Sequence, residues 1–172
     1  MGGFLTAVRR LSQAAGVISA GLILLSILVV CQMIFVRAVL NQSAIWQTEF
    51  TTFALIAATF LGAPYILLTR GHVNVDVLPL ALPHGARKPL AFVAAAIGFS
   101  FCALFFWNSV DWWLEAWESG QRTSSMWRAR LWIPYLSAPV GLGLLCLQYL
   151  AEILALATDR EHPFGLRPED RL

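Results

Sequence analysis

The chain has 172 residues, of which 58% are hydrophobic and only 13% are charged, and its mean hydropathy is +0.68. Soluble domains carry about 25% charged residues, so a water-soluble globule of this composition would lack the polar groups to cover its surface. The apolar excess also excludes a disordered chain, which has the opposite composition. The net charge of +2 is too small to indicate a nucleic acid partner.

Charged residues are absent from four long stretches of the chain. An α-helix needs about 20 mostly apolar residues to cross about 30 Å of hydrocarbon, and so short a chain could not bury four such helices in its own core. We therefore expect an all-α membrane protein, a single domain over residues 1–172 with four transmembrane helices and a polar C-terminal tail at 152–172. The uncharged stretches are Leu11–Val36, Phe50–Thr69, Pro89–Val110 and Leu131–Ala151.

The first stretch has one alternative interpretation, because Arg9 and Arg10 precede it as they would precede a signal peptide. Its apolar run is longer than the roughly 7–15 residues of a signal peptide's apolar region, and no small-x-small cleavage motif follows Val30. We therefore expect a retained first span.

An amphipathic segment at 111–122 follows the third span. Its acidic residues and one arginine are spaced by 4, 3 and 4 residues, which gathers them in a stripe about 60° wide on a helix. Gly120 favours a helix end, and the last two charges could form an i,i+4 pair. The third helix either extends beyond the membrane or turns along its surface. The stripe consists of Asp111, Glu115, Glu118 and Arg122.

The distribution of Lys and Arg predicts the orientation. Eight of them lie in the N-terminal segment, the 70–88 loop and the C-terminal tail, against four in the other two loops. Cytoplasmic loops are enriched in these residues, so we expect both termini in the cytoplasm. All seven tryptophans then lie at or near the other face, where they form either an uneven lipid belt or a partner surface: Trp46, Trp107, Trp112, Trp113, Trp117, Trp127 and Trp132.

Small residues and prolines inside the spans predict how the helices pack. Small residues four apart let helix backbones approach in lipid. Pro64 and Pro139 lie well inside their spans and predict bends, whereas Pro134 suits the first turn of the fourth helix. The small-residue pairs are Gly16 with Ala20, Ala91 with Ala95, Ala94 with Gly98, and Ser137 with Gly141.

The spans lack the side chains that most membrane enzymes and ion carriers need. Proton relays and ion sites use ionisable groups at membrane depth, and here every such group lies at the edges of the spans or outside them. The three histidines lie outside the spans, so haem has no axial ligands. No Cys-x-x-Cys pair and no glycine-rich phosphate loop occur. The sequence predicts no enzyme, no cofactor and no metal or substrate site.

Two segments and the last span resemble a known family. The first segment has Arg37 and Asn41 in the turn after the first span, then Trp46 and Glu49 at the start of the second. The others are Arg70, His72 and Asp76 after the second span, and Pro139 in the fourth. Together they are similar to the DctQ-like small membrane subunit of tripartite ATP-independent periplasmic (TRAP) transporters. Many members have an acidic residue where this chain has Thr48, and an arginine near Gln148 and Glu152.

The residues of these motifs have plausible structural roles. Glu49 would lie in the first turn of the second helix, at the positive end of its dipole, and Arg37 could pair with it across the turn. Arg70 would end the second helix, and His72 and Asp76 would tie the following loop to backbone groups. Ordinary capping and contact with a partner subunit remain open for each.

The resemblance implies a function that the residues alone do not. In such systems a large permease subunit carries the substrate and coupling sodium ions, and a periplasmic solute-binding protein delivers an organic acid. The small subunit is similar to a non-catalytic scaffold for the large one in the bacterial inner membrane. The alternative is a self-assembling small four-helix membrane protein, either a channel or a structural adaptor. Glu115, Trp117 and Glu118 are candidates for contact with the binding protein or the large subunit.

Overall fold

The computed structural model describes residues 2–69 and 84–158, and these are helical apart from short connections. The helices are α1 (Gly2–Val39), α2 (Ile45–Leu68), α4 (His84–Glu118), α5 (Trp132–Tyr135) and α6 (Ser137–Ala157). Four segments are long and apolar enough to cross a membrane: α1, α2, α4, and α5 together with α6. The expected all-α fold with four transmembrane helices is confirmed.

The helices extend beyond the uncharged stretches. At about 1.5 Å per residue, the 38 residues of α1 and the 35 residues of α4 span about 57 and 52 Å, more than the hydrocarbon thickness. α4 runs unbroken to Glu118, so the amphipathic segment extends the third helix instead of turning along the surface at 111. The expected pair of Glu118 with Arg122 is wrong, because the helix ends before Arg122 and Gly120 takes a left-handed conformation, φ 61°.

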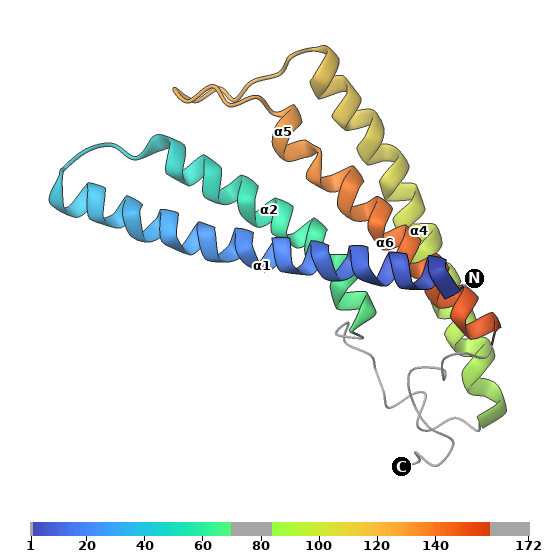
Figure 1. Cartoon of the computed structure of the whole chain (residues 1–172). Helices are drawn as coiled ribbons and strands as arrows, with labels where there is room; N and C mark the ends of the chain where they lie inside the picture. Colours follow the sequence, from blue (N-terminus) through green and yellow to red (C-terminus); the bar gives the residue numbers. More distant parts are fainter. Residues whose placement is uncertain (1, 70–83, 159–172) are drawn as a thin grey trace.

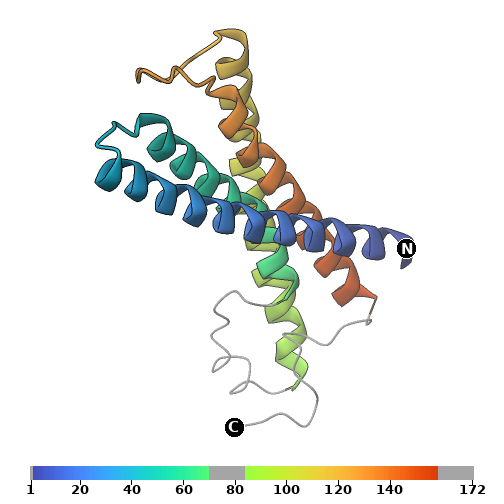
Figure 2. The same cartoon turned by 60° about the vertical axis from the view of Figure 1, so that its left-hand side comes forward.

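The helices form two antiparallel hairpins, which lie apart at their turns and meet farther along their length (Figure 1). α1 packs against α2, and α4 packs against α6. The two hairpins are joined mainly where α2 packs against α6, with a smaller contact between α1 and α6. Figure 2 shows, as Figure 1 does, that the hairpins splay apart toward their two turns. The molecule is therefore an open V and not a closed four-helix bundle.

Small residues set the closest helix contacts, but the predicted pairs are only partly confirmed, because Ala20 and Ala94 are exposed. A Cβ built at Gly141 of α6 would lie 2.4 Å from the backbone oxygen of Phe60 in α2. Gly16 of α1 lies against the ring of Tyr65, and Gly98 of α4 lies against the ring of Tyr149. At Gly141 the neighbour is backbone, so any side chain would block the approach, whereas at Gly16 and Gly98 an added Cβ would require the tyrosine ring to shift.

Buried hydrogen bonds join the helices at three depths. The Ser12 hydroxyl of α1 donates to Oε1 of Gln148 in α6, at 2.8 Å. The Ser19 hydroxyl donates to the carbonyl of Ala58 in α2, at 2.7 Å. Near the turn, Nε2 of Gln47 donates to Oε1 of Gln32, at 3.2 Å. These bonds fix the register of α1 against its neighbours, because in lipid an unpaired polar group finds no water to replace its partner.

Two of the three prolines lie where the sequence suggested, Pro64 inside its span and Pro134 in the first turn of its helix, and Pro139 does not. Pro64 lies inside α2 and is fully buried. Pro139 was expected well inside the fourth span, but the helix is interrupted at Leu136 and Pro139 lies in the first turn of α6. There its missing N–H costs little, because the first turn has no helical acceptor for it. Pro134 lies in the short helix α5.

Candidate functional site: an apolar groove and an aromatic end

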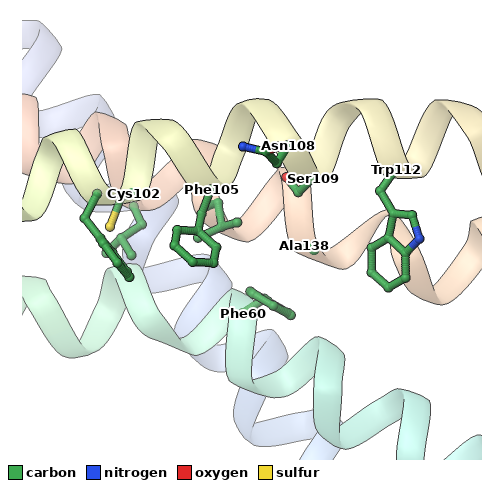
Figure 3. A pocket seen from close by; sticks show the side chains of 10 residues that line it. Phe60, Cys102, Phe105, Asn108, Ser109, Trp112 and Ala138 are labelled. Carbon is green, nitrogen blue, oxygen red and sulfur yellow. The ribbon is translucent and has the colours of Figure 1, made fainter.

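An apolar groove of about 560 Å³ lies between the two hairpins. Phe60 of α2 borders it on one side, and a row of α4 side chains borders it on the other (Figure 3). α6 supplies Ala138, Leu142 and Leu145. The row on α4 is Phe101, Cys102, Phe105, Asn108, Ser109 and Trp112, whose spacing follows one helix face.

None of the described residues that line the groove is charged, and the polar groups of Asn108 and Ser109 bond to their own helix. Nδ2 of Asn108 donates to the carbonyl of Leu104, at 2.8 Å. The Ser109 hydroxyl donates to the carbonyl of Phe106, at 2.7 Å. The ring of Phe101 remains 63% exposed. The shape and the apolar lining of the groove therefore suit an apolar helix or acyl chain.

An aromatic cluster holds the end of α4 against α5. Trp112 stacks on Tyr135 with ring centroids 4.2 Å apart, and Trp117 meets Trp132 edge-to-face at 4.5 Å. Nε1 of Trp113 donates to the carbonyl of Trp132, at 3.1 Å. Trp117 is nevertheless 52% exposed. These tryptophans thus pack against one another and against Tyr135, which the sequence did not reveal, and one side of Trp117 remains exposed.

The charges around this cluster are exposed. Glu115 and Glu118 are exposed at the end of α4, and within the described part of the chain neither forms an ion pair with the arginines that follow. Residues 121–131 fold back as a short hairpin in which Arg122 lies opposite Arg130. The hairpin is held by the N–H of Leu131 donating to Gln121 and by that of Thr123 donating to Ala129. This end of the molecule therefore presents both signs of charge for contacts outside the chain.

The turn between α1 and α2 uses two motif residues as its structure requires. Arg37 lies in the last turn of α1, where a positive charge meets the negative end of the helix dipole. Asn41 takes a left-handed conformation, φ 51°, which asparagine tolerates better than most residues. Trp46 packs edge-to-face on Phe50 at 6.3 Å and stays 44% exposed.

The expected role of Glu49 is wrong in two respects. α2 begins at Ile45, and its first turn contains no acidic residue. Glu49 opens the second turn, where the effect of the helix dipole has largely faded. The pair with Arg37 does not form either, and Oε2 of Glu49 is buried without a hydrogen-bond partner among the described residues.

The motif residues do not converge on one site. Arg37, Asn41, Trp46 and Glu49 lie around the first turn, and the candidates on α4 lie at the other hairpin. Pro139 is buried in α6, two residues from Gly141. Arg70, His72 and Asp76 lie outside the described residues. The groove was missed in the sequence, although the apolar spacing along α4 could have indicated one of its walls.

Four helical segments long and apolar enough to cross a membrane define a multi-pass membrane protein. Residues 26–159 match the family described as "Tripartite ATP-independent periplasmic transporters, DctQ component". The chain belongs to this family, which confirms the resemblance drawn from its motifs, and members of the family are components of TRAP transporters.

Three relatives show the extent of the similarity. The C4-dicarboxylate TRAP transporter small permease protein DctQ of Vibrio cholerae is 26% identical over 141 residues, 68% of this chain and 60% of the relative. Its counterpart in Pseudomonas aeruginosa is 25% identical over 132 residues, 76% of this chain and 63% of the relative. The isethionate TRAP transporter permease protein DctMQ of Oleidesulfovibrio alaskensis is 24% identical over 111 residues, 64% of this chain and 17% of the relative. This chain thus covers about 60% of the length of the first two relatives. No solved structure matches it.

Proposed function

We propose that this chain is a non-catalytic scaffold of a secondary, ion-coupled TRAP transporter. It would brace a large multi-span permease subunit during uptake of an organic acid that a periplasmic binding protein delivers. Family membership supports the transporter assignment, and the relative DctMQ, which is much longer than its matching region, supports association with a larger permease. The substrate-determining residues would belong to the partners.

The observation that carries the scaffold role is the surface of the helices. In the most apolar part of α1 and of α4, only 17% of the residues are buried within the chain. The groove between the hairpins is apolar and concave. Helices in lipid associate through close packing of such shapes, since apolar side chains gain little by leaving lipid tails. A surface of this kind suits a subunit that packs against another membrane protein.

We place both termini in the cytoplasm of a bacterial cell, with the protein in the inner membrane. The excess of Lys and Arg in the terminal segments and the 70–88 loop supports this orientation. The aromatic cluster and the exposed Glu115 and Glu118 would then face the periplasm. They would be available there to the binding protein or to the large subunit.

Purification from native membranes tests the proposal. A tagged small subunit should retain a large multi-span permease after mild detergent extraction. A preparation that contains only oligomers of this chain would contradict the proposal and favour a self-assembling channel or structural adaptor.

Transport by the reconstituted complex tests the absence of a substrate site. Replacing Glu49, Arg70 or Asp76 by Ala should lower uptake only as far as it lowers the amount of complex. A variant with normal complex abundance, normal substrate affinity and no transport would show that this chain contributes directly to transport.

A further inference from the structure

Unsatisfied polar atoms gather at the start of α2. Four buried side-chain polar atoms lack a hydrogen-bond partner among the described residues, and three of them belong to this region: Gln47 Oε1, Glu49 Oε2 and Thr51 Oγ1. Folded proteins leave few such atoms unpaired, and a carboxylate oxygen is the most costly of the three to bury alone. The clustering indicates that the described residues leave this end of α2 without polar partners.

Glu49 is the residue of this group without an internal role. Gln47 already binds Gln32 through its other amide atom, and the hydroxyl of Thr51 can rotate toward its own helix. Glu49 does not cap the helix, because it lies beyond the first turn, and it forms no ion pair with Arg37. Neither helix capping nor an ion pair with Arg37 therefore explains the carboxylate at this position.

Glu49 lies on the face of α2 that borders the groove. Eleven residues separate it from Phe60, and at 100° per residue the two directions differ by only about 20°. Along the helix axis they are about 16 Å apart at 1.5 Å per residue. Phe60 lines the groove, so the carboxylate follows the same face toward the turn. The face thus combines an apolar depression with a single negative charge about three helical turns away.

We propose that Glu49 binds a Lys or Arg side chain of the large permease subunit. That side chain would belong to a helix whose apolar residues fill the groove between the hairpins. The proposal rests on the scaffold function above and names its contact. A partly buried carboxylate is stabilised by an opposite charge, and long basic side chains reach such positions from helices near the membrane surface. The partner helix would carry its basic residue about 16 Å along the axis from the residues against Phe60.

Co-purification of the complete complex tests this contact. Glu49→Gln keeps the size of the side chain and removes its charge. We expect the amount of large subunit retained by the tagged small subunit to fall about tenfold or more, because the basic partner is left without its counter-charge. Asp111→Asn is the matched control: it likewise removes the charge of a carboxylate without changing its size, at an exposed position on α4, and should leave retention unchanged.

Thermal unfolding of the isolated small subunit shows whether Glu49→Gln affects the fold or only the contact with the large subunit. Among the described residues Glu49 has no ion pair and its buried oxygen has no hydrogen bond, so Glu49→Gln should insert and melt like the parent. If the variant unfolds at a lower temperature by itself, the residue is structural and the proposal is overturned. Equal retention of the large subunit by parent and variant would also overturn it.

A charge-reversal selection identifies the partner residue. Glu49→Lys should abolish retention, and second-site changes that restore it should replace a Lys or Arg of the large subunit by Asp or Glu. If Glu49→Gln instead reduces only bound phosphatidylethanolamine, the carboxylate binds a lipid amine and the proposal fails. If the parent itself retains no large subunit, the scaffold function fails first, which distinguishes the two cases.

Discussion

The contact between Gly141 and Phe60 predicts a large effect of one added methyl group. A Cβ at Gly141 would lie 2.4 Å from the backbone oxygen of Phe60 and 2.5 Å from its carbonyl carbon. Both atoms belong to the backbone of α2, so they cannot move without shifting the helix. Overpacking of this kind costs about 1–3 kcal/mol. We therefore expect Gly141→Ala to lower the free energy of unfolding by about that amount.

Two other glycines of the same chain provide matched controls. Gly143 also lies on α6, but a Cβ there would meet the ring edge of Phe106 at 3.1 Å, and a ring can rotate away. Gly21 of α1 has nothing within 4 Å of its Cβ position. Gly143→Ala should therefore cost less than Gly141→Ala, and Gly21→Ala should cost nothing.

Titration of detergent-solubilised protein with sodium dodecyl sulfate, followed by tryptophan fluorescence, measures these differences. Gly21→Ala should be the most stable of the three variants, Gly143→Ala should be intermediate, and Gly141→Ala should be the least stable. If Gly141→Ala were as stable as Gly21→Ala, the close approach of α2 and α6 would be refuted, and with it the junction between the hairpins.

Three further predictions address orientation, the exposed charges and the buried polar contacts. In a background without native cysteines, Cys at Ser124 should be labelled only from the periplasmic side, and labelling from the cytoplasm would reverse the topology. Reversing Glu115 and Glu118 to Lys should weaken uptake that depends on the binding protein but leave membrane insertion intact; normal uptake would reduce this end to an interfacial helix. Ser12→Ala should lower the free energy of unfolding by about 0.6 kcal/mol, the average for such bonds between membrane helices. Ser100→Ala, which removes only a bond within α4, should have a smaller effect, and equal effects would contradict a role of the buried bond.

The helices were predictable because lipid imposes a simple requirement on sequence. Charged groups are excluded from the hydrocarbon, so their gaps reveal the spans before any packing is known. Asn41 and Gly141 were also visible in the sequence as a turn residue and a small packing residue. At both positions the geometry of the backbone limits which residue types can occur, so the residue type itself indicates the geometry.

The helix ends and the groove were not predictable in the same way. A charge marks the edge of the hydrocarbon and not the end of a helix, so α2 begins one turn before Glu49 and α4 continues past Asp111. The groove brings Phe60 and Phe105 from different hairpins to one surface. Their proximity depends on the angle at which α6 meets α2 and α4, and no local pattern in the sequence encodes that angle.

The position of α6 explains why two changes near the same groove should have different consequences. In its most apolar part, 39% of the residues of the α5–α6 span are buried, against 17% in α1 and in α4. α6 thus packs against α4 within its own hairpin and against α2 and α1 of the other, and Gly141 lies where α6 meets α2. Gly141→Ala should therefore lower both the stability of the isolated subunit and its retention of the large one. Glu49→Gln alters only the open side of the V, so it should lower retention alone. A scaffold requires this separation, since its shape must be set within the chain before the partner arrives.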